Sequence, residues 1–527
     1  MLWLTRWPLH PFLLAAYPVL FLYSRNVDEA APADVVRPML IALAGTGVIF
    51  LVLLRVLRSS SRAAAVTTVA VIAFFGYGHV VDPVQGMEIG GIVVGRGLFL
   101  LPLWTLIALL VMLRAARAHR GLSRLTSGLN VAGLVLLLFS MGQLLWSGTG
   151  PGKDAPALWT QFAEQEAQRL ASSGETGQRP DIYFIVLDEY ARDDVLKEVF
   201  GYDNRDFLSF LESRGFYLAR ESHSNYTFTY PSLASTLNLD YLPRLAGRCR
   251  AEGITTPLLA RMIEDNLLAL LLKSMGYRFY LFPSDFYVTN RNRNADRLFR
   301  RTRHGLNNEF EQALISTTAL RPLIGGPVNN RLNRLYQLQT LGEVARLPGP
   351  KLVFAHIIMP HVPYVFDREG NLPRHATLQR SAYTIEEYRE LYVGQTHYLN
   401  SRMREVVDGI LAASKRPPVI VIQGDHGFRH CIIHRGSKPE ALSPEMQSAI
   451  LNALYLPEGG QEDAYPSISP VNTFRLVLNR YFGFSLPLLP DETYVLETRR
   501  GRFHPVKVAC WMRPPGNREP ERPIRKP

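Results

Sequence analysis

Three apolar runs in the chain end in side chains that commonly bind metal ions. These ends carry Asp188 and Glu189, then His361, and then Asp425 and His426. A single Asp after a strand is usually a turn residue, but three such ends in one chain are hard to explain as turns. Carboxylates together with histidine suit one or two divalent ions, with zinc or manganese as the candidates.

The runs that lead to these ends have the pattern of buried parallel strands. They are "IYFIVLD" from Ile182, "KLVFAHIIM" from Lys351 and "PPVIVIQGDHG" from Pro417. Continuous apolar runs without polar alternation are typical of strands that are covered on both faces. Helical patterns lie between the runs, so the chain from residue 180 onward is expected to form an α/β domain with a mostly parallel central sheet. Ligands bind outside the carboxyl ends of the strands in such sheets.

Two of the intervening helices carry clear end signals. The stretch "TTPLLARMIEDNLLALLLKSMG" predicts one long helix, with Thr256 as its N-cap, Pro257 in its first turn and Gly276 at its end. The stretch from 384 to 414 opens with a capping box formed by Thr384 and Glu387, and it predicts a second long helix.

The stretch "NYTFTYPSLAST", residues 225–236, places hydroxyl groups ahead of an expected helix. Pro231 suits the first turn of a helix, and the N–H groups of such a helix start favour an anion. A Thr hydroxyl is a poor nucleophile at neutral pH, and a divalent cation that ligates its oxygen lowers its pKa. The stretch alone does not decide whether the hydroxyl of Thr229, or that of Thr227 two residues earlier, is such a nucleophile. A helix-capping role for Thr229 is the alternative.

Four motifs resemble those of the alkaline phosphatase–sulfatase superfamily. They are "IYFIVLDEYAR", "TYPSLAST", "MPHVPY" and "IQGDHG", which follow one another in this order within residues 180–485. Each motif alone is weak, but the ordered set is strong. Apolar spans followed by such a domain also resemble the lipoteichoic acid synthases and the lipid A phosphoethanolamine transferases.

The resemblance implies roles for individual residues. The metal-binding acid at the end of the family's first strand corresponds to Asp188, with Glu189 as the adjacent alternative. The family's second Asp–His pair corresponds to Asp425 and His426. The nucleophile position corresponds to Thr229, which also ligates the metal.

The same resemblance separates phosphoryl chemistry from sulfate chemistry. His361 corresponds to a sulfatase histidine that contacts the transferred group, so it is expected to bind substrate or protonate a leaving oxygen. His356 and His434 are further candidates without an equally firm counterpart. Leu233 stands where sulfatases have Arg, and Thr229 cannot become the formylglycine aldehyde that sulfatases use. These departures favour phosphoryl transfer.

Five apolar runs in the first 150 residues are long enough, or nearly so, to cross a bilayer core, which takes roughly 20 helical residues. They are Pro8–Tyr23, Val36–Leu57, Ala63–Val81, Gly91–Leu113 and Leu129–Trp146. Arg residues fill the loops after the second and fourth runs, whereas all the acids of this region lie in the other two loops. Basic loops stay cytoplasmic, so the N-terminus is expected inside and everything after about residue 148 outside.

The expected organisation therefore has four parts. They are an all-α transmembrane bundle of five helices at 1–148, a linker with a helix of surface or connecting type at 149–179, the α/β catalytic domain at 180–510, and a disordered tail at 511–527. Net charge is +12, but nucleic acid is not expected as a partner, because the large domain lies outside the cytoplasm. The cysteines Cys249, Cys431 and Cys510 allow one disulfide without indicating which pair forms it.

The function expected from these patterns is a metal-dependent phosphotransferase or phosphodiesterase in a bacterial-type inner membrane. A phosphoethanolamine or phosphoglycerol group would pass from a membrane phospholipid donor to an envelope lipid or glycan acceptor through a phospho-threonine. One alternative is a sulfatase-like hydrolase of soluble sulfate or phosphate esters. The other is a non-catalytic, membrane-anchored binding domain.

Overall fold

The structure is a computed structural model of the 527-residue chain. It describes residues 7–27, 30, 32–81, 88–89, 92–93, 97–118, 122–147, 154–174, 179–301, 309–321, 327–373, 385–429, 442–499 and 502–508. The expected capping residue Thr384, the cysteines Cys431 and Cys510, the candidate His434 and the tail 511–527 lie outside the described residues. Cys249 is a buried free thiol.

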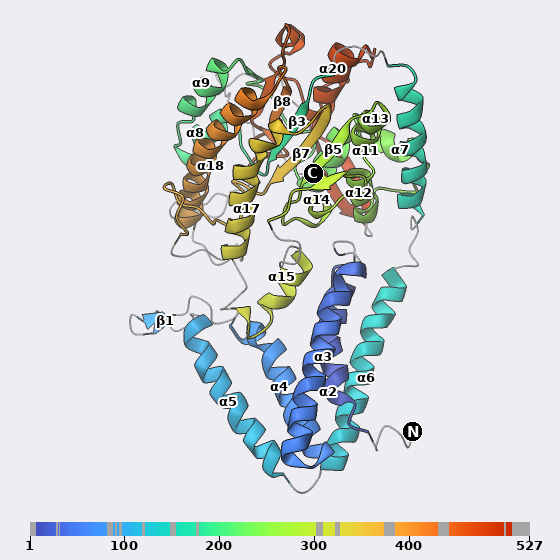
Figure 1. Cartoon of the computed structure of the whole chain (residues 1–527), viewed down its shortest axis with the longest axis vertical. Coiled ribbons are helices and arrows are strands. Elements are labelled where there is room, and N and C mark those ends of the chain that lie inside the picture. Colours follow the sequence, from blue (N-terminus) through green and yellow to red (C-terminus); the bar gives the residue numbers. More distant parts are fainter. Residues whose placement is uncertain are drawn as a thin grey trace, which may run out of the picture.

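The first part of the chain forms a bundle of helices below the α/β domain (Figure 1). Its helices are α2 (His10–Arg25), α3 (Pro32–Leu57), α4 (Ser60–Val81), α5 (Gly97–Arg117) and α6 (Leu122–Ser147). Four helices in the described part of the chain are long and apolar enough to span a membrane: Pro32–Leu57, Ser60–Val81, Leu100–Arg117 and Leu122–Leu145. These four correspond to the second to fifth expected runs.

The first expected run forms α2, which has 16 residues. At 1.5 Å per residue such a helix is about 24 Å long, which is shorter than a bilayer core of about 30 Å. A fifth span therefore stays a prediction. In favour of it, α2 packs among α3, α4 and α6, and its start lies at the end of the bundle away from the α/β domain (Figure 1).

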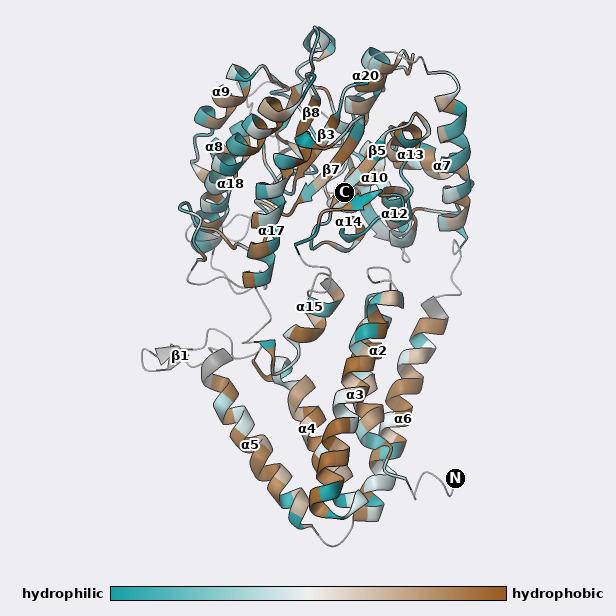
Figure 2. Cartoon of the chain, viewed as in Figure 1, coloured by the Kyte–Doolittle hydropathy of each residue, from teal (hydrophilic) through white to brown (hydrophobic). Residues whose placement is uncertain are grey.

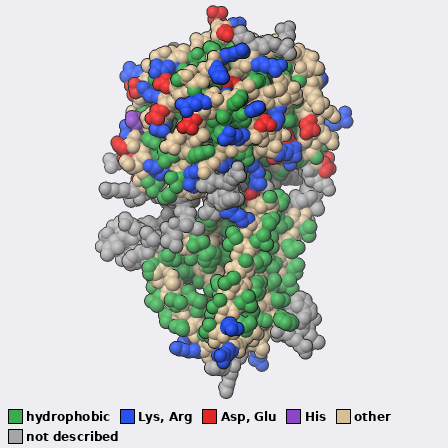
Figure 3. Space-filling view, in the orientation of Figure 1, with side chains coloured by type: hydrophobic (Ala, Val, Ile, Leu, Met, Phe, Trp, Pro, Cys, Tyr) green, Lys and Arg blue, Asp and Glu red, His purple; other side chains and the backbone are tan. Residues whose placement is uncertain are grey.

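The surface of the bundle is apolar along its length and basic at its far end. Hydrophobic residues dominate the helices (Figure 2), and Lys and Arg side chains gather at the end farthest from the α/β domain (Figure 3). Arg55 and Arg117 lie in the last turns of α3 and α5, which end there. This distribution agrees with the expected orientation, in which the basic end is cytoplasmic.

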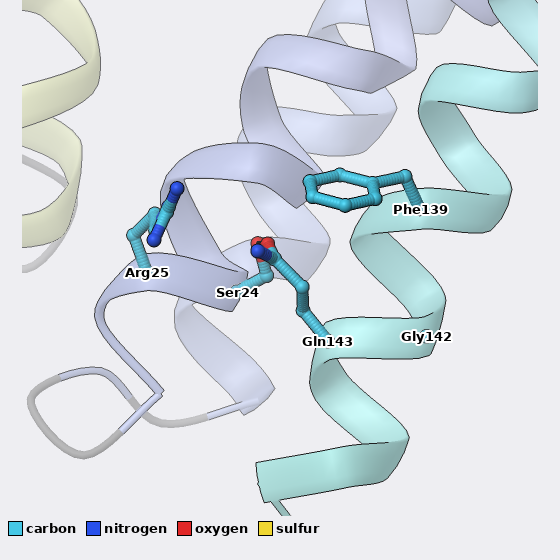
Figure 4. Close-up of a pocket in the computed structure, with 5 residues that line it drawn as sticks. All are labelled: Ser24, Arg25, Phe139, Gly142 and Gln143. Carbon is cyan, nitrogen blue, oxygen red and sulfur yellow. Dashed lines mark hydrogen bonds between the residues drawn. The ribbon is translucent and has the colours of Figure 1, made fainter.

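Polar side chains lie at the other end of the bundle, between α2 and α6. A groove of about 490 Å³ there is lined by Ser24, Arg25, Phe139, Gly142 and Gln143. The Ser24 hydroxyl donates a hydrogen bond to Gln143 Oε1 at 3.1 Å, and Figure 4 shows these two side chains facing each other while Arg25 points away. Polar groups of this kind suit the level of a bilayer interface.

The α/β domain is built on a seven-stranded sheet with the order β4-β9-β8-β3-β7-β5-β6. The strands are β3 (Ile182–Leu187), β4 (Tyr217–Leu218), β5 (Arg278–Phe282), β6 (Arg297–Leu298), β7 (Lys351–Ile357), β8 (Val419–Gly424) and β9 (Asn452–Tyr455). Strands β8, β3, β7, β5 and β6 are parallel, and β9 pairs antiparallel with β8. The prediction of a mostly parallel α/β domain is confirmed.

Helices cover both faces of this sheet. One core contains Phe184 and Val186 together with side chains of α7 (Ala155–Ala171), α10 (Thr229–Leu237), α11 (Leu242–Arg248), α12 (Thr256–Glu264), α13 (Leu267–Ser274) and α20 (Pro470–Phe482). The other contains Tyr183 and Ile185 together with side chains of α8 (Asp193–Phe200), α9 (Arg205–Ser213), α17 (Pro327–Leu341) and α18 (Ile385–Ala413). Successive residues of β3 therefore enter opposite cores, so every position of the strand is apolar.

The single helix expected from Thr256 to Gly276 is wrong in two respects. Thr255 is the N-cap, and its side chain accepts the N–H of Leu258. The stretch also forms two helices, α12 and α13, because Asn266 caps α13 by accepting the N–H of Ala269. The apolar periodicity of the sequence continues through the break between α12 and α13, so periodicity alone does not reveal the capping role of Asn266.

The segment around α15 (Glu309–Ser316) connects the bundle to the α/β domain (Figure 1). Phe310 and Leu314 pack with Val19 and Val35 of the bundle. The Arg37 guanidinium lies 3.3 Å from the Glu311 carboxylate. A second ion pair joins Asp34, near the start of α3, to Arg291 of the α/β domain.

Single-cysteine labelling tests the orientation. In a variant with Cys431 and Cys510 replaced by Ser, Gln165→Cys on α7 should react with a membrane-impermeant maleimide in whole cells. Ala118→Cys, after α5, should react only after permeabilisation, because it follows the basic end of that helix. Buried Cys249 serves as the unlabelled background. Labelling of position 118 but not 165 in intact cells would overturn the orientation.

Candidate metal centre

Three neighbouring strands bring acidic and imidazole groups to one edge of the sheet. Asp188 follows β3, Asp425 follows β8, and His356 lies in β7. The strand β3 pairs with β7 on one side and β8 on the other, with Val186 opposite His356 and Leu187 opposite Gly424. All three groups therefore meet at the carboxyl ends of the central strands, where the strand pattern predicted a site.

The three side chains form a buried cluster with the spacing of a metal site. Ligand atoms of Asp188, His356 and Asp425 all lie within 4.8 Å of one another. His356 Nε2 is 3.5 Å from one oxygen of Asp188. His426 Nε2 adds a further nitrogen, 3.7 Å from Asp188 Oδ1 and 3.7 Å from Asp425 Oδ2.

Three of these atoms are buried and have no hydrogen-bond partner among the described residues: Asp188 Oδ1, His356 Nε2 and Asp425 Oδ2. A buried polar atom without a partner is costly, and native structures rarely retain one without an ion or water to satisfy it. Here the three converge on one point. Two carboxylate oxygens and an imidazole nitrogen are donors that fit a divalent ion such as zinc or manganese.

The other nitrogen of each ring is held by the surrounding protein. His356 Nδ1 lies 2.9 Å from Thr289 Oγ1, and His426 Nδ1 lies 2.8 Å from the carbonyl oxygen of Gly427. Because a carbonyl only accepts, the His426 proton sits on Nδ1 and the lone pair of Nε2 faces the cluster. Such outer contacts are the usual means of orienting a metal-binding histidine.

The backbone around Asp425 approaches other segments too closely for a side chain. A Cβ on Gly424 would lie 2.7 Å from the carbonyl oxygen of Tyr190, and one on Gly427 would lie 2.6 Å from that of Ala449. The Asp425 Oδ1 atom accepts the N–H groups of Glu189 at 3.1 Å and His426 at 2.9 Å. Oδ2 is left to face the cluster.

The two carboxyl groups respond differently to burial. Burial opposes the ionisation of Asp188, but the nearby imidazoles of His361, His356 and His426 outweigh it and hold the pKa of Asp188 below its ordinary value. The pKa of Asp425 is raised, first by burial and then by the negative charge of Asp188. Without a cation the two carboxyl groups therefore differ: ionisation is easier than usual for Asp188 and harder than usual for Asp425.

Thr229 is the first residue of α10, and it faces this cluster. Its Oγ1 lies 3.4 Å from His426 Nε2. The N-cap of α10 is Phe228, and no side chain caps the helix start, so the capping role considered for Thr229 is not what the structure shows. The rival Thr227 is buried, with 4% of its surface exposed, and no hydrogen bond to the cluster is found for it among the described residues.

His361 lies beside the cluster on the segment that follows β7. Its N–H donates to the carbonyl oxygen of Asp188 at 3.1 Å, and its Nδ1 lies 2.6 Å from the carbonyl oxygen of Val362. Gln395 holds the same segment by donating to the carbonyl oxygens of Pro360 and His361 at 3.1 and 3.0 Å. The half-buried ring is thus near the cluster without belonging to it.

Glu189 is the expected residue that the structure separates from the cluster. Its backbone is left-handed, with φ of 65°, and its carboxylate is not in the group of ligand atoms that lie within 4.8 Å of one another. One carboxylate oxygen accepts the backbone N–H of Arg429 at 3.4 Å. His356, a further candidate without a firm counterpart in the motifs, is in that group, and its partner Thr289, which carries no motif, was not predicted.

No family model matches the chain, and no curated protein matches it either. Solved structures do resemble it, at low sequence identity. One is the lipooligosaccharide phosphoethanolamine transferase A (EptA) from Neisseria meningitidis, with 14% identity and a TM-score of 0.37 over 90% of this chain and 94% of that one.

Two others align with the α/β part. The periplasmic domain of EptC from Escherichia coli, in a complex with Zn, shows 14% identity and a TM-score of 0.40 over 59% of this chain and 85% of that one. BT1596, a 2-O GAG sulfatase, shows 15% identity and a TM-score of 0.38 over 59% of this chain and 72% of that one.

Removal of one buried donor should strip the metal. We expect His356→Ala to lose most of its bound divalent ion after metal loading and desalting, because a metal site rarely survives the loss of one of a few ligands. Elemental analysis of the purified full-length protein measures this loss. His397→Ala, an exposed histidine of α18, is the matched control and should retain the ion. Wild-type protein that binds no stoichiometric metal would overturn the site.

The effect of Asp425→Asn on stability should change sign with metal. In chelated protein at neutral pH we expect a higher free energy of unfolding, because a group whose folded pKa is raised loses stability as pH increases through that pKa. In metal-loaded protein we expect a lower value, because a ligand is lost. Denaturant unfolding with and without chelator measures both. Asp408→Asn removes an exposed ion pair with Arg214, so its effect on the free energy of unfolding should have the same sign with and without chelator. A lower free energy of unfolding for Asp425→Asn in chelator would contradict the raised pKa of Asp425.

Proposed function

We propose that this chain is a membrane-anchored, metal-dependent phosphotransferase that works through a phospho-threonine. The observation that supports this proposal is the position of Thr229. Its hydroxyl begins a helix and lies 3.4 Å from His426 Nε2, at the edge of a buried cluster of Asp188, His356 and Asp425. A nucleophile, a helix start and metal-type donors thus lie together.

The residues proposed to hold the ion are Asp188, His356, Asp425 and His426, with the Thr229 hydroxyl beside them. When bound, a divalent ion lowers the pKa of a ligating hydroxyl and offsets the charge of a phosphoryl group. The start of α10 supports the same substrate, because the N–H groups of the first turn point toward an anion there. Zinc and manganese both suit this donor set.

Group transfer is proposed to take two displacements. Thr229 Oγ1 gives its proton to water and forms a bond to phosphorus, while the bond from phosphorus to the donor alcohol breaks and the alcohol oxygen takes a proton from His361. His361 suits this role because its backbone N–H donates to the carbonyl oxygen of Asp188 at 3.1 Å and its ring Nδ1 lies 2.6 Å from the Val362 carbonyl oxygen. In the second displacement the acceptor hydroxyl attacks phosphorus and gives its proton to His361, the bond from phosphorus to Thr229 Oγ1 breaks, and Oγ1 takes a proton back from water.

A lipid donor is proposed from the way the domain sits on the bundle. The contacts of Phe310 and Leu314 with the bundle and the ion pair of Asp34 with Arg291 place the α/β domain directly against it. The donor is proposed to be a phospholipid with a phosphoethanolamine or phosphoglycerol head group, and the acceptor an envelope lipid or glycan. The resemblance of the motifs to transferases of this kind supports the same choice.

The nucleophile is the test of this function. Thr229→Ala should lose turnover by several orders of magnitude, because the covalent route disappears, and it should keep its metal. Thr229→Ser should retain part of the activity, since the hydroxyl survives. Peptide mapping after exposure to total membrane lipids should locate the phospho-adduct on Thr229, and the mass of the adduct identifies the head group.

Thr227→Ala is the matched control for this experiment. It removes the neighbouring hydroxyl two residues away and should cost far less activity. An adduct on Thr227, or full turnover by Thr229→Ala, would refute the phospho-threonine at Thr229.

A further inference from the structure

An anionic phosphate needs positive charge at the proposed site. Asp188 and Asp425 lie in the cluster, Glu189 directly follows Asp188 in the chain, and all three are buried. One divalent ion offsets the charges of Asp188 and Asp425 and so leaves no excess of positive charge for an incoming phosphate. The helix at the site does not supply the missing cation, because α10 has the sequence "TYPSLASTL" without Lys or Arg.

Arg429 lies at the edge of the site, three residues after His426. Its guanidinium carbon is 4.8 Å from the ring centroid of Phe228, the residue that precedes Thr229. The backbone N–H of Arg429 donates to Glu189 Oε1 at 3.4 Å, and the backbone N–H of Glu189 donates to Asp425 Oδ1. Arg429 is thus tied to the residue before the nucleophile and to the segments that carry both aspartates.

The guanidinium of Arg429 has no acid partner in the part of the chain that the structure describes. Among the described residues, no Asp or Glu forms an ion pair with Arg429, and its side chain is half-buried rather than fully extended into solvent. Arg192 near the site pairs with Asp194 at 2.7 Å. Buried Arg334 donates to the carbonyl oxygen of Pro363 at 2.7 Å; burial lowers its pKa, and the charges of Asp285 and Asp188 act against that shift, so this guanidinium already faces two acids. A half-buried cation beside an anion site, with no acid partner, is expected to have an anionic ligand.

We propose that Arg429 binds the non-bridging oxygens of the phosphate group that enters the site. This inference rests on the proposed phosphoryl chemistry, and it names the ligand as a phosphate or phosphate ester anion. The contact with the Phe228 ring holds the guanidinium beside the residue that precedes Thr229. The planar fork matches two phosphate oxygens, which a lysine ammonium does not.

Binding of inorganic phosphate by the full-length, metal-loaded protein in detergent tests this role. Titration calorimetry should show that Arg429→Ala weakens phosphate binding by about tenfold or more, since a hydrogen bond to a charged group has about that value. The phosphate affinity of Arg429→Lys should lie between those of wild type and Arg429→Ala, because lysine keeps the positive charge but lacks the planar pair of N–H donors. Arg346→Ala, at an exposed arginine of the 3-10 helix Glu343–Arg346, should match wild type.

Two controls separate binding from folding and from metal loss. Metal content of Arg429→Ala should equal that of wild type, because the guanidinium is not a donor to the ion. If Arg429→Ala does not fold, Arg429→Gln keeps a planar polar end group on a shorter side chain without the charge, and it should show the same loss of phosphate binding.

The outcomes distinguish this inference from the proposed function. Equal phosphate affinity in wild type and Arg429→Ala overturns the role of Arg429, and so does a wild-type protein that binds no phosphate when loaded with metal. Neither result concerns the adduct on Thr229. Conversely, weakened phosphate binding without any adduct on Thr229 supports Arg429 as the phosphate ligand and removes the phospho-threonine.

Discussion

The burial of Asp188 and Asp425 side by side is the constraint on which the rest of the site depends. Two carboxylates in a low-dielectric interior repel each other, and both cannot ionise without a cation between them. The pKa of Asp188 is lowered and that of Asp425 is raised, as expected when two neighbouring carboxyl groups compete to ionise. Retention of both acids at the centre of the sheet, with oxygens that lack partners, therefore favours a cation in the functional state.

The sheet produces this conflict through its topology. The strands β8, β3 and β7 lie next to one another and run parallel. The residues at their carboxyl ends therefore lie close together. Gly424 and Gly427 let the Asp425 segment approach neighbouring backbone more closely than any side chain allows. Exposed strand ends would let the two acids separate into water, whereas α10 and the segment carrying His361 close over them.

Much of this arrangement follows from local sequence, and the remainder depends on tertiary contacts. The strand ends at Asp188 and Asp425 are predictable because continuous apolar runs ended in acids. The role of His356 is harder to predict from sequence, because a histidine inside such a run is usually a packed core residue. The register of β7 against β3 brings it to the cluster. The break between α12 and α13 and the turn at Glu189 depend on side-chain caps and backbone angles that periodicity does not report.

One short segment, residues 289–291, contacts both the membrane bundle and the metal-type cluster. Thr289, in α14 (Tyr287–Asn290), lies 2.9 Å from His356 Nδ1, and Arg291, two residues later, pairs with Asp34 of α3. Asp34 is buried, with 7% of its surface exposed, and a buried carboxylate is stable only when its charge is compensated. The segment that compensates this charge is therefore the same one that holds the outer nitrogen of His356.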